Sequence, residues 1–451
     1  MVDPPSPISP PRRRTAVALT VVVALLLALG AGVVATRRGT GGGPMPPAAP
    51  DTRPPRPTPD TPAGDQPAAV ETLKAQVAAI RGLAWKRPLA VNIVSEDELA
   101  RRVREFNLEE QEKNRERIAG DEATLKLLDL IPERTDYAQT LDELLAGGVL
   151  GYYDDETKEL VVGGDPAGDL APATRSVIVH ELTHALTDQH FDFGPPTTAL
   201  DDANRTEELA GYLALIEGDA ELVSDLWQQR HLSGREQAAA LFGQIGGNPL
   251  AALRAPLYLL EALRFPYEEG TDFVRHRYEA GGFAAVDAAY RRPPSSTEHI
   301  LHPELYDAGP PSDPPAVSDL ATATGCGAVD AGVLGEFDMA KVLREHVTTA
   351  RAERAAAGWN GDSFGVVRCG STLGLADRWR TDTASDAAEL VQALGEWSRG
   401  WSSSTRAPDA EGRFSGPSGA GRIVRSGSRV DLVLAGDAAT ADRVASALPA
   451  G

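Results

Sequence analysis

The spacing of apolar residues changes several times along the chain, and each spacing predicts a different kind of element. In residues 69–83 apolar positions recur with a helical period, whereas PLAVNIV at residues 88–94 is typical of a strand. Ser95 then offers a helix N-cap with Glu98 three residues later, so we expect a charged helix from there to about residue 118. Shorter helical patterns follow at residues 122–130 and 140–145.

The middle of the chain combines a hairpin pattern with long helical patterns. Two short apolar runs within residues 148–164 flank the polar tetrapeptide DDET, which predicts a β-hairpin. A mainly apolar stretch from about residue 172 to 190 predicts a helix. Two prolines at residues 195 and 196 indicate that it ends before them. A second long helix is expected at about residues 203–230, and helical patterns continue to about residue 290.

Beyond residue 310 a Pro-rich link leads to a region with a different pattern. Strand-like runs (FGVVRC, LGLADRW, RIVRSG and RVDLVLAG) alternate with helical ones at residues 385–397 and 439–448, which predicts a small α+β domain. The chain has two cysteines, Cys326 and Cys369, too few for a disulfide scaffold or a cysteine-ligated zinc site. They can pair if this part is exported, or remain ordinary thiols if it is not.

The N-terminus carries a long apolar stretch. Residues 15–36 are apolar or small and lie between three arginines and a pair of arginines, which is long enough to cross a bilayer core of about 30 Å. We expect a single signal-anchor helix with a cytoplasmic N-tail at residues 1–14, and cleavage after a signal peptide is the alternative. The Pro- and Gly-rich residues that follow predict a spacer between the membrane and a folded body.

Composition excludes one large class of function. The formal net charge is −21, and the part that follows the apolar stretch has no long block of basic residues. A nucleic-acid surface needs a basic stripe, so we expect no nucleic-acid partner.

The chemistry is concentrated in the predicted helix at residues 172–190. His180, Glu181 and His184 form an H-E-x-x-H motif, which places both histidines on one helix face one turn apart. Both imidazoles can then bind one metal ion, and Glu181 can take a proton from a water on that ion. The flanking residues are apolar, and ionisable groups buried among them are costly unless a metal compensates them. The pattern therefore predicts a Zn²⁺ site.

Catalytic zinc normally has three protein ligands, so a third is needed. His190 has the spacing of a three-histidine site, but Thr187 stands where a sharp turn requires glycine, which makes His190 an unfavoured choice. Glu217 follows the apolar run LALI on the second long helix and is the better candidate. Glu221, one turn later, is an alternative ligand or an outer-shell partner. Asp188 and Asp219 are candidates for orienting a ligating imidazole.

At these residues the chain resembles gluzincin-type zinc metallopeptidases, in which a Glu on a downstream helix completes H-E-x-x-H. It resembles more closely a poorly characterised group of bacterial membrane-anchored HExxH proteins, over most of residues 75–400. The strings that carry this resemblance are GYYDDETKELVV, VHELTHALTDQHF, ALIEGDAE, PYEEGTDFV, PPSSTEHILHPELY and AAAGWNGDSF. The chain departs from the family at Glu221, where an Asp is usual, and at His299, where a polar amide is expected.

The resemblance implies a peptide or protein substrate, with the hairpin at residues 148–164 as its edge-strand binding site. Hydrolysis of an amide builds negative charge on a tetrahedral intermediate, and a nearby donor can stabilise it. His302 is the candidate for that role, with Tyr267 and Tyr306 behind it, and a structural histidine before Pro303 is the alternative.

Together these patterns predict an α+β, mainly helical protein with a zincin-like core and an N-terminal transmembrane helix. The expected parts are an N-tail (1–14), a membrane helix (15–36), a linker (37–69), a metallopeptidase domain (70–310) and a small α+β domain (311–451). We expect a single-pass membrane protein with an extracytoplasmic catalytic domain. The alternative is a non-catalytic surface protein with a structural zinc site and a partner-binding C-terminal domain.

Overall fold

The protein is described from a computed structural model, which covers residues 66–145, 148–165, 169–243, 249–311, 315–317 and 319–449. Within these residues the fold is α+β and mainly helical, with two separate β-sheets. The predicted membrane helix and most of the predicted linker lie outside the described residues. Among the helices that are described, none combines the length and apolar character needed to cross a bilayer.

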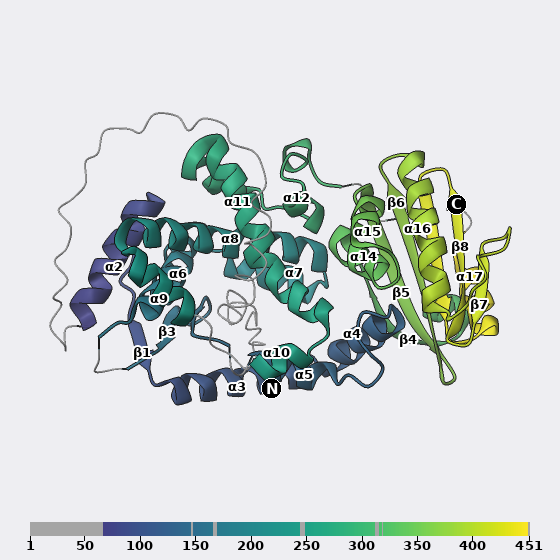
Figure 1. The fold of residues 1–451 in the computed structure, drawn as a ribbon, viewed down its shortest axis with the longest axis horizontal. Helices are drawn as coiled ribbons and strands as arrows, with labels where there is room; N and C mark the ends of the chain where they lie inside the picture. The colour runs from purple at the N-terminus through teal and green to yellow at the C-terminus, as the bar shows by residue number, and fades with distance from the viewer. Residues whose placement is uncertain are drawn as a thin grey trace, which may run out of the picture.

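The part of the chain before residue 310 is mostly helical (Figure 1). Its helices are α2 (Gln66–Arg81), α3 (Glu96–Lys113), α4 (Arg115–Leu127), α5 (Tyr137–Leu145), α6 (Pro172–Phe191), α7 (Gly194–Asp202), α8 (Thr206–His231), α9 (Gly234–Gly243), α10 (Pro249–Arg254), α11 (Leu257–Arg291), α12 (Thr297–Leu301) and the short 3₁₀ helix η2 (Tyr306–Ala308). The first of these, α2, begins before the predicted end of the linker at residue 69.

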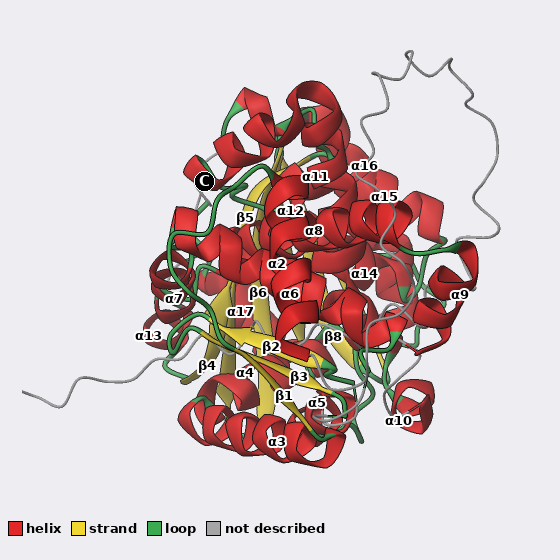
Figure 2. Cartoon of the chain, turned by 90° about the vertical axis from the view of Figure 1, so that its left-hand side faces the viewer, coloured by secondary structure: helices red, strands yellow, loops and turns green. Residues whose placement is uncertain are grey.

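A small sheet lies between α6 and α3 (Figure 2). Its strands are β1 (Val91–Val94), β2 (Gly151–Asp154) and β3 (Glu159–Gly163), in the order β1-β3-β2. β1 pairs with β3 in parallel, whereas β2 and β3 form the predicted antiparallel hairpin. β1 and β2 are the two edge strands of this sheet, and β2 is the one that contacts α6.

The C-terminal part forms a six-stranded antiparallel sheet in the order β4-β5-β6-β9-β8-β7. The strands are β4 (Gly327–Gly332), β5 (Trp359–Cys369), β6 (Thr372–Thr381), β7 (Arg413–Gly416), β8 (Gly419–Ser426) and β9 (Arg429–Ala435). The accompanying helices are α13 (Leu320–Thr324), α14 (Gly335–Arg344), α15 (Thr349–Ala356), α16 (Ala384–Trp401) and α17 (Ala438–Ala447).

Helices cover both faces of this sheet. In β9, Leu432 and Leu434 face the cluster that contains α16, whereas Val433 faces the cluster that contains α17. A sheet covered on both faces explains why RVDLVLAG is almost continuously apolar. A disulfide joins Cys326 to Cys369, which ties the segment before β4 to the end of β5.

One hydrophobic cluster runs through both parts of the chain. It joins Leu215 of α8 with Trp397 of α16 and Leu432 of β9, all of them buried. Two contacts across the predicted boundary near residue 310 illustrate this continuity. The Trp401 Nε1 donates to the Leu127 carbonyl at 2.8 Å, and the rings of Phe265 and Phe337 lie 4.6 Å apart.

A close helix crossing brings α8 against α11. Gly218 and Gly270 face each other there, and a Cβ added to Gly218 would lie 2.2 Å from the Gly270 carbonyl oxygen. Only glycine permits this backbone contact, because any side chain would have to displace main-chain atoms. The crossing holds Glu217 on α8 close to Tyr267 on α11.

We expect Gly218→Ala to lower the free energy of unfolding by about 1–3 kcal/mol, because it overpacks this contact. Gly395→Ala in α16 is the matched control, since its added methyl group meets no atom within 4 Å. The control should gain about 0.5–1 kcal/mol from helix propensity. Urea unfolding followed by circular dichroism measures the free energy of unfolding of both variants. Equal stability of Gly218→Ala and wild type would contradict the close contact between Gly218 and Gly270.

Candidate metal centre

α6 presents the two histidines of the H-E-x-x-H motif on one face. The helix begins with Pro172, which suits a first helical position, and ends at Asp192 in the left-handed conformation. His180 and His184 are both buried, and their Nε2 atoms lie 2.9 Å apart. The predicted helix is confirmed nearly to the residue.

α8 places a buried carboxylate against this pair. Glu217 Oε2 lies 3.2 Å from His180 Nε2 and 3.3 Å from His184 Nε2. These three residues form the group in the described part of the chain that can hold a metal ion. The structure therefore brings together the three residues that we predicted as ligands.

The dimensions of this triangle fit a zinc ion. Two ligand atoms that are each about 2.0–2.1 Å from a tetrahedral zinc lie roughly 3.3–3.4 Å apart. The three ligand-atom separations of 2.9, 3.2 and 3.3 Å approximate one face of such a tetrahedron. Two imidazoles and one carboxylate also match the donor set of catalytic zinc sites.

Electrostatics at the cluster favour a cation. Burial by itself would raise the pKa of Glu217, but the neighbouring imidazoles outweigh burial and hold its pKa at about 2. Burial also opposes a charge on His180, yet its hydrogen bonds with Glu217 and Glu221 keep the His180 pKa well above its usual value. The carboxylates thus attract positive charge to this spot, and a metal ion can supply it in place of protons.

Glu181 lies beside the cluster without being part of it. The side chain is fully buried and has no side-chain hydrogen bond or ion pair in the described part of the chain, although the backbone N–H of Tyr153 is directed at it. Burial raises the pKa of Glu181 to about 7, although the two imidazoles counteract part of that effect. An unpaired buried carboxylate is costly, which calls for a functional explanation.

Glu221 contacts the outer face of one ligand. Its Oε1 lies 3.1 Å from Nδ1 of His180, whose Nε2 faces the other ligand atoms. This is the geometry of a carboxylate that accepts from a ligating imidazole and fixes its orientation. Of the two roles left open for Glu221, the structure favours the outer-shell one.

We expect Glu221→Ala to weaken zinc binding by about 10- to 100-fold, because His180 loses the partner that orients its ring. Glu208→Ala, on the same helix but paired with Arg205 away from the cluster, is the control and should bind zinc normally. Competition with a zinc-binding dye measures both affinities. Unchanged affinity in Glu221→Ala would exclude the orienting role.

The structure separates His190 from the cluster. α6 continues through Thr187, whose Oγ1 donates to the carbonyls of Thr183 and His184, so the chain makes no turn there. His190 Nε2 instead lies 2.8 Å from the Ala84 carbonyl oxygen. The three-histidine alternative is therefore not supported.

Asp188 and Asp219 bind elements other than the ligating imidazoles. Asp219 is buried and pairs with Arg81 of α2 at 3.0 Å. Asp188 is also buried and accepts from the Tyr153 hydroxyl at 2.8 Å and from Lys158 at 2.6 Å. Asp188 thus anchors the β2–β3 hairpin onto α6, which corrects our expectation for both aspartates.

The hairpin places an edge strand beside Glu181. The Lys158 N–H donates to the Asp154 carbonyl, and the Gly163 N–H donates to the Leu150 carbonyl. These bonds determine which residues of β2 form hydrogen bonds with β3. In that pattern the backbone groups of Gly151 and Tyr153 point away from β3. The Tyr153 N–H is the one directed toward Glu181, whose pKa it lowers.

Tyr267 is the residue near the cluster whose position the sequence reasoning missed. Its buried ring stacks on His180 with centroids 6.3 Å apart. Burial raises the Tyr267 pKa well above its usual value and keeps the phenol protonated beside Glu217. Tyr267 belongs to the string PYEEGTDFV, one of the strings that carry the family resemblance. That Tyr267 lies at the cluster is evident only from the crossing of α8 and α11.

The contacts of His302 in the described part of the chain are with Glu304 and Glu336 and not with the cluster, so its role as an oxyanion donor stays a prediction. Thr297 at the start of α12 donates to Glu207. Glu217 follows Glu207 by a rise of about 15 Å along α8. His302 itself pairs with Glu336 of α14 at 2.8 Å. Its role in the structure is to join α12 to the C-terminal part.

A buried carboxyl beside this pair predicts a pH effect. Burial, with Glu336 and Asp382 nearby, raises the pKa of Glu298 to about 8. The folded state thus keeps a proton that the unfolded chain releases near pH 4.5, and the stability from this group falls as pH rises through 8. We expect Glu298→Gln to raise the melting temperature relative to wild type at pH 9 but not at pH 4. An equal difference at both pH values, measured by calorimetry, would contradict this.

Comparisons with known proteins bear on the C-terminal part of the chain. Residues 322–445 match a family described as "Domain of unknown function (DUF8575)". No curated protein and no solved structure matches the chain. The matched segment begins in α13 and ends in α17, so it spans the six-stranded sheet and does not include the metal-binding residues.

Proposed function

We propose that the protein is a zinc metallopeptidase of the gluzincin type, with His180, His184 and Glu217 as ligands. The observation that carries the proposal is the ligand triangle together with the unpaired, buried Glu181 beside it. A structural zinc site closes its fourth position with a protein ligand and has no need of a neighbouring acid. The donor set and Glu181 together favour catalysis over a structural site.

Zinc bound at the triangle would lower the pKa of a coordinated water and polarise a substrate carbonyl. Glu181 is the general base that takes the proton of the attacking water and later passes it to the leaving amine. Its pKa of about 7 suits both steps, because it can accept and release a proton near neutral pH. The Tyr267 phenol lies close enough to the cluster to donate a hydrogen bond there.

The substrate in this proposal is an extended peptide. It would add to the edge of β2 that has no partner strand among the described residues, where the backbone groups of Gly151 and the Tyr153 carbonyl can pair with it. Three contacts hold that edge still: Tyr153 and Lys158 bind Asp188, and Gly151 lies against Val177 of α6. A rigid edge strand positions the scissile bond at the metal.

The proposed location is the outer face of the cell membrane, with residues 15–36 as the anchor. The apolar length of that segment supports it. The disulfide between Cys326 and Cys369 supports it as well, because such bonds persist in oxidising compartments.

The experiment that tests the function is a comparison of new peptide N-termini in cells that express wild type or Glu181→Gln. Cleavages that need Glu181 would identify both the activity and its specificity. Cleavage that is equal in the two strains, with zinc bound in both proteins, would favour the alternative of a non-catalytic surface protein with structural zinc.

A further inference from the structure

The β7–β8 hairpin and α17 lie at the end of the molecule that is farthest from α6 (Figure 1), and a hollow lies between them. It has a volume of about 330 Å³ and lies between the β7–β8 hairpin, the loop before β7 and the start of α17. The residues at its base are small, among them Ala420, Ala438 and Ala441. No side chain of the described residues fills the space, and its size is at the lower end of the range for small-molecule sites.

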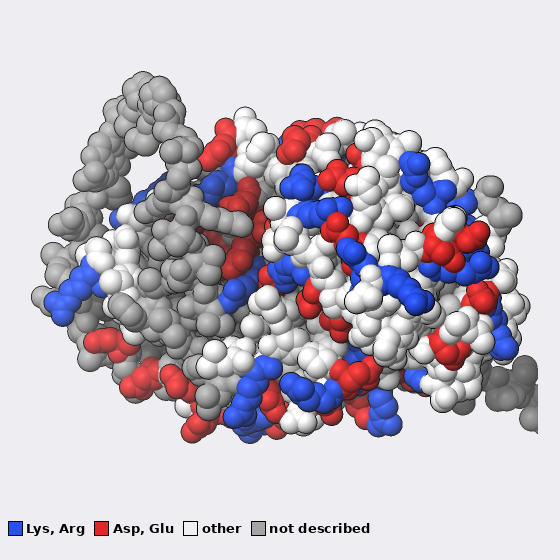
Figure 3. All heavy atoms as spheres, turned by 45° about the vertical axis from the view of Figure 1, so that its right-hand side comes forward, with Lys and Arg blue, Asp and Glu red and all other residues white. Residues whose placement is uncertain are grey.

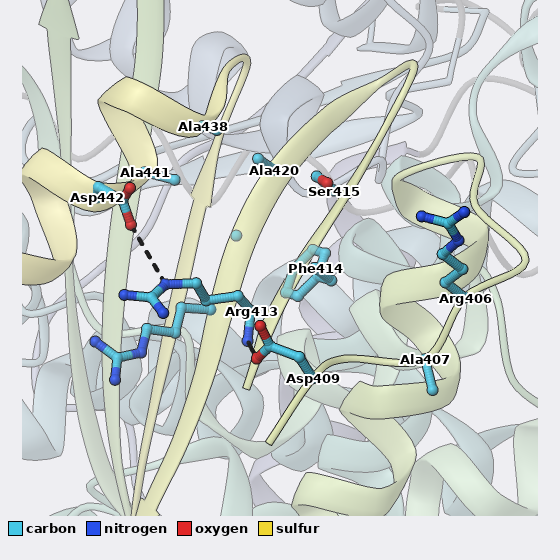
Figure 4. A pocket seen from close by; sticks show the side chains of 12 residues that line it. Arg406, Ala407, Asp409, Arg413, Phe414, Ser415, Ala420, Ala438, Ala441 and Asp442 are labelled. Atoms are coloured by element: carbon cyan, nitrogen blue, oxygen red, sulfur yellow. Dashed lines mark hydrogen bonds and ion pairs between the residues drawn. The ribbon is translucent and has the colours of Figure 1, made fainter. Parts of the chain in front are cut away.

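Three arginines line this hollow. Arg413 of β7 and Arg422 of β8 stand directly opposite each other in the strand register, whereas Arg406 lines the other side of the hollow, on the loop before β7 (Figure 4). Like charges at opposite positions of a strand pair are destabilising. This arrangement is unexpected in a chain with a net charge of −21, whose charges of both signs are interspersed over the face drawn in Figure 3.

The protein's own groups use few of the donors on these guanidinium groups. Arg422 Nε donates to the Glu411 carbonyl, and Arg413 Nε lies 3.7 Å from Asp442, beyond hydrogen-bond distance. The Arg406 guanidinium has neither a hydrogen bond nor an ion pair within the described residues. Each guanidinium carries five N–H donors, so most of them remain available to a ligand.

The acidic residues at the hollow do not neutralise it. The Asp409 carboxylate accepts from the backbone N–H groups of Glu411 and Arg413, so it holds the loop. Asp442 is largely exposed, and its distance from Arg413 makes it a weak partner. The Arg413 and Arg422 pair therefore has only the distant Asp442 carboxylate nearby, because Asp409 already accepts two backbone hydrogen bonds.

We propose that this hollow binds a small anionic ligand through a carboxylate or phosphate group. Arginine forks match both groups in geometry, and each can accept two parallel hydrogen bonds from one guanidinium. The bound anion would relieve the repulsion between Arg413 and Arg422.

Isothermal titration of the full-length protein with inorganic phosphate and with succinate, at constant ionic strength, tests this site. We expect saturable binding of one ion per chain, and the tighter of the two probes identifies the ligand's acid group. Arg413→Ala and Arg422→Ala should each weaken binding by about tenfold or more, because charged hydrogen bonds are lost.

Two further variants distinguish binding in the hollow from general attraction of anions to the protein surface. Arg425→Ala lies on the same strand, but its guanidinium bonds the Ala384 carbonyl outside the hollow, so binding should not change. Asp442→Asn removes a competing charge and should tighten binding by up to about fivefold, a gain that misfolding cannot produce. The proposal is overturned if neither probe gives saturable heat, or if Arg425→Ala weakens binding as much as Arg413→Ala.

Discussion

Replacement of Glu181 by Gln is expected to lower kcat/KM for peptide hydrolysis by about 10²–10⁴-fold while zinc content stays unchanged. Gln has the size and shape of Glu but cannot accept a proton from water. Glu181 contributes no atom to the ligand triangle, so the amide should not disturb the metal. Steady-state kinetics on peptides found by cleavage profiling, with zinc measured by atomic absorption, give both quantities.

The stability of this variant provides an internal check. Burial makes the charged form of Glu181 unfavourable, so the neutral amide should leave the melting temperature equal or higher above pH 7. Glu208→Gln, at the start of α8 where Glu208 pairs with Arg205, is the control and should keep full activity. Full activity in Glu181→Gln with zinc bound would remove Glu181 from the mechanism.

The second large effect is expected from the third ligand. Glu217→Ala should weaken zinc binding by more than about 100-fold, the upper end of what an outer-shell partner costs. Two imidazoles remain, but the negative charge that compensates the cation and the third corner of the triangle are gone. Activity should fall with the metal content, and both can be measured on protein dialysed against a chelator and reloaded with zinc.

His190→Ala is the matched control for this loss. His190 is on the same helix as the ligands but bonds the Ala84 carbonyl, so zinc should be retained. Retention of zinc in Glu217→Ala together with loss in His190→Ala would reverse the ligand assignment and favour a three-histidine site.

The local part of the site could be predicted because it depends on helix geometry alone. Residues four apart on α6 share a face, so His180 and His184 meet whatever surrounds them. Glu217 could be predicted because LALI places it on an apolar face that must be buried against another helix. The N-cap of α3 at Ser95 was predictable for the same local reason.

Contacts that depend on helix crossings could not be predicted from the sequence. The role of Glu221 follows from the packing of α8 on α6, and the position of Tyr267 follows from the backbone contact between Gly218 and Gly270; no periodicity encodes either. The contact of His302 with Glu336 of α14 was not predictable either, because a resemblance in sequence does not give partners that are remote along the chain. The aspartates at 188 and 219 were assigned to imidazoles because their true partners are remote in sequence.

Weak patterns explain the remaining errors in the elements. β4 has the sequence GAVDAG and β7 has RFSG, and neither shows the alternation that reveals a strand. The charged helix predicted from Ser95 to residue 118 is divided at Asn114 into α3 and α4. The strands with long apolar runs, β5, β6, β8 and β9, were predicted because their apolar character requires burial.

The continuous hydrophobic cluster has a consequence for how this protein can change over evolutionary time. Trp401 bonds to α4, and Phe337 packs on Phe265, so neither part can be exchanged without exposing apolar surface on the other. Transfer of the sheet to another protein would need a new cover for that surface. The sheet and the metal-bearing helices are therefore expected to be inherited as one unit.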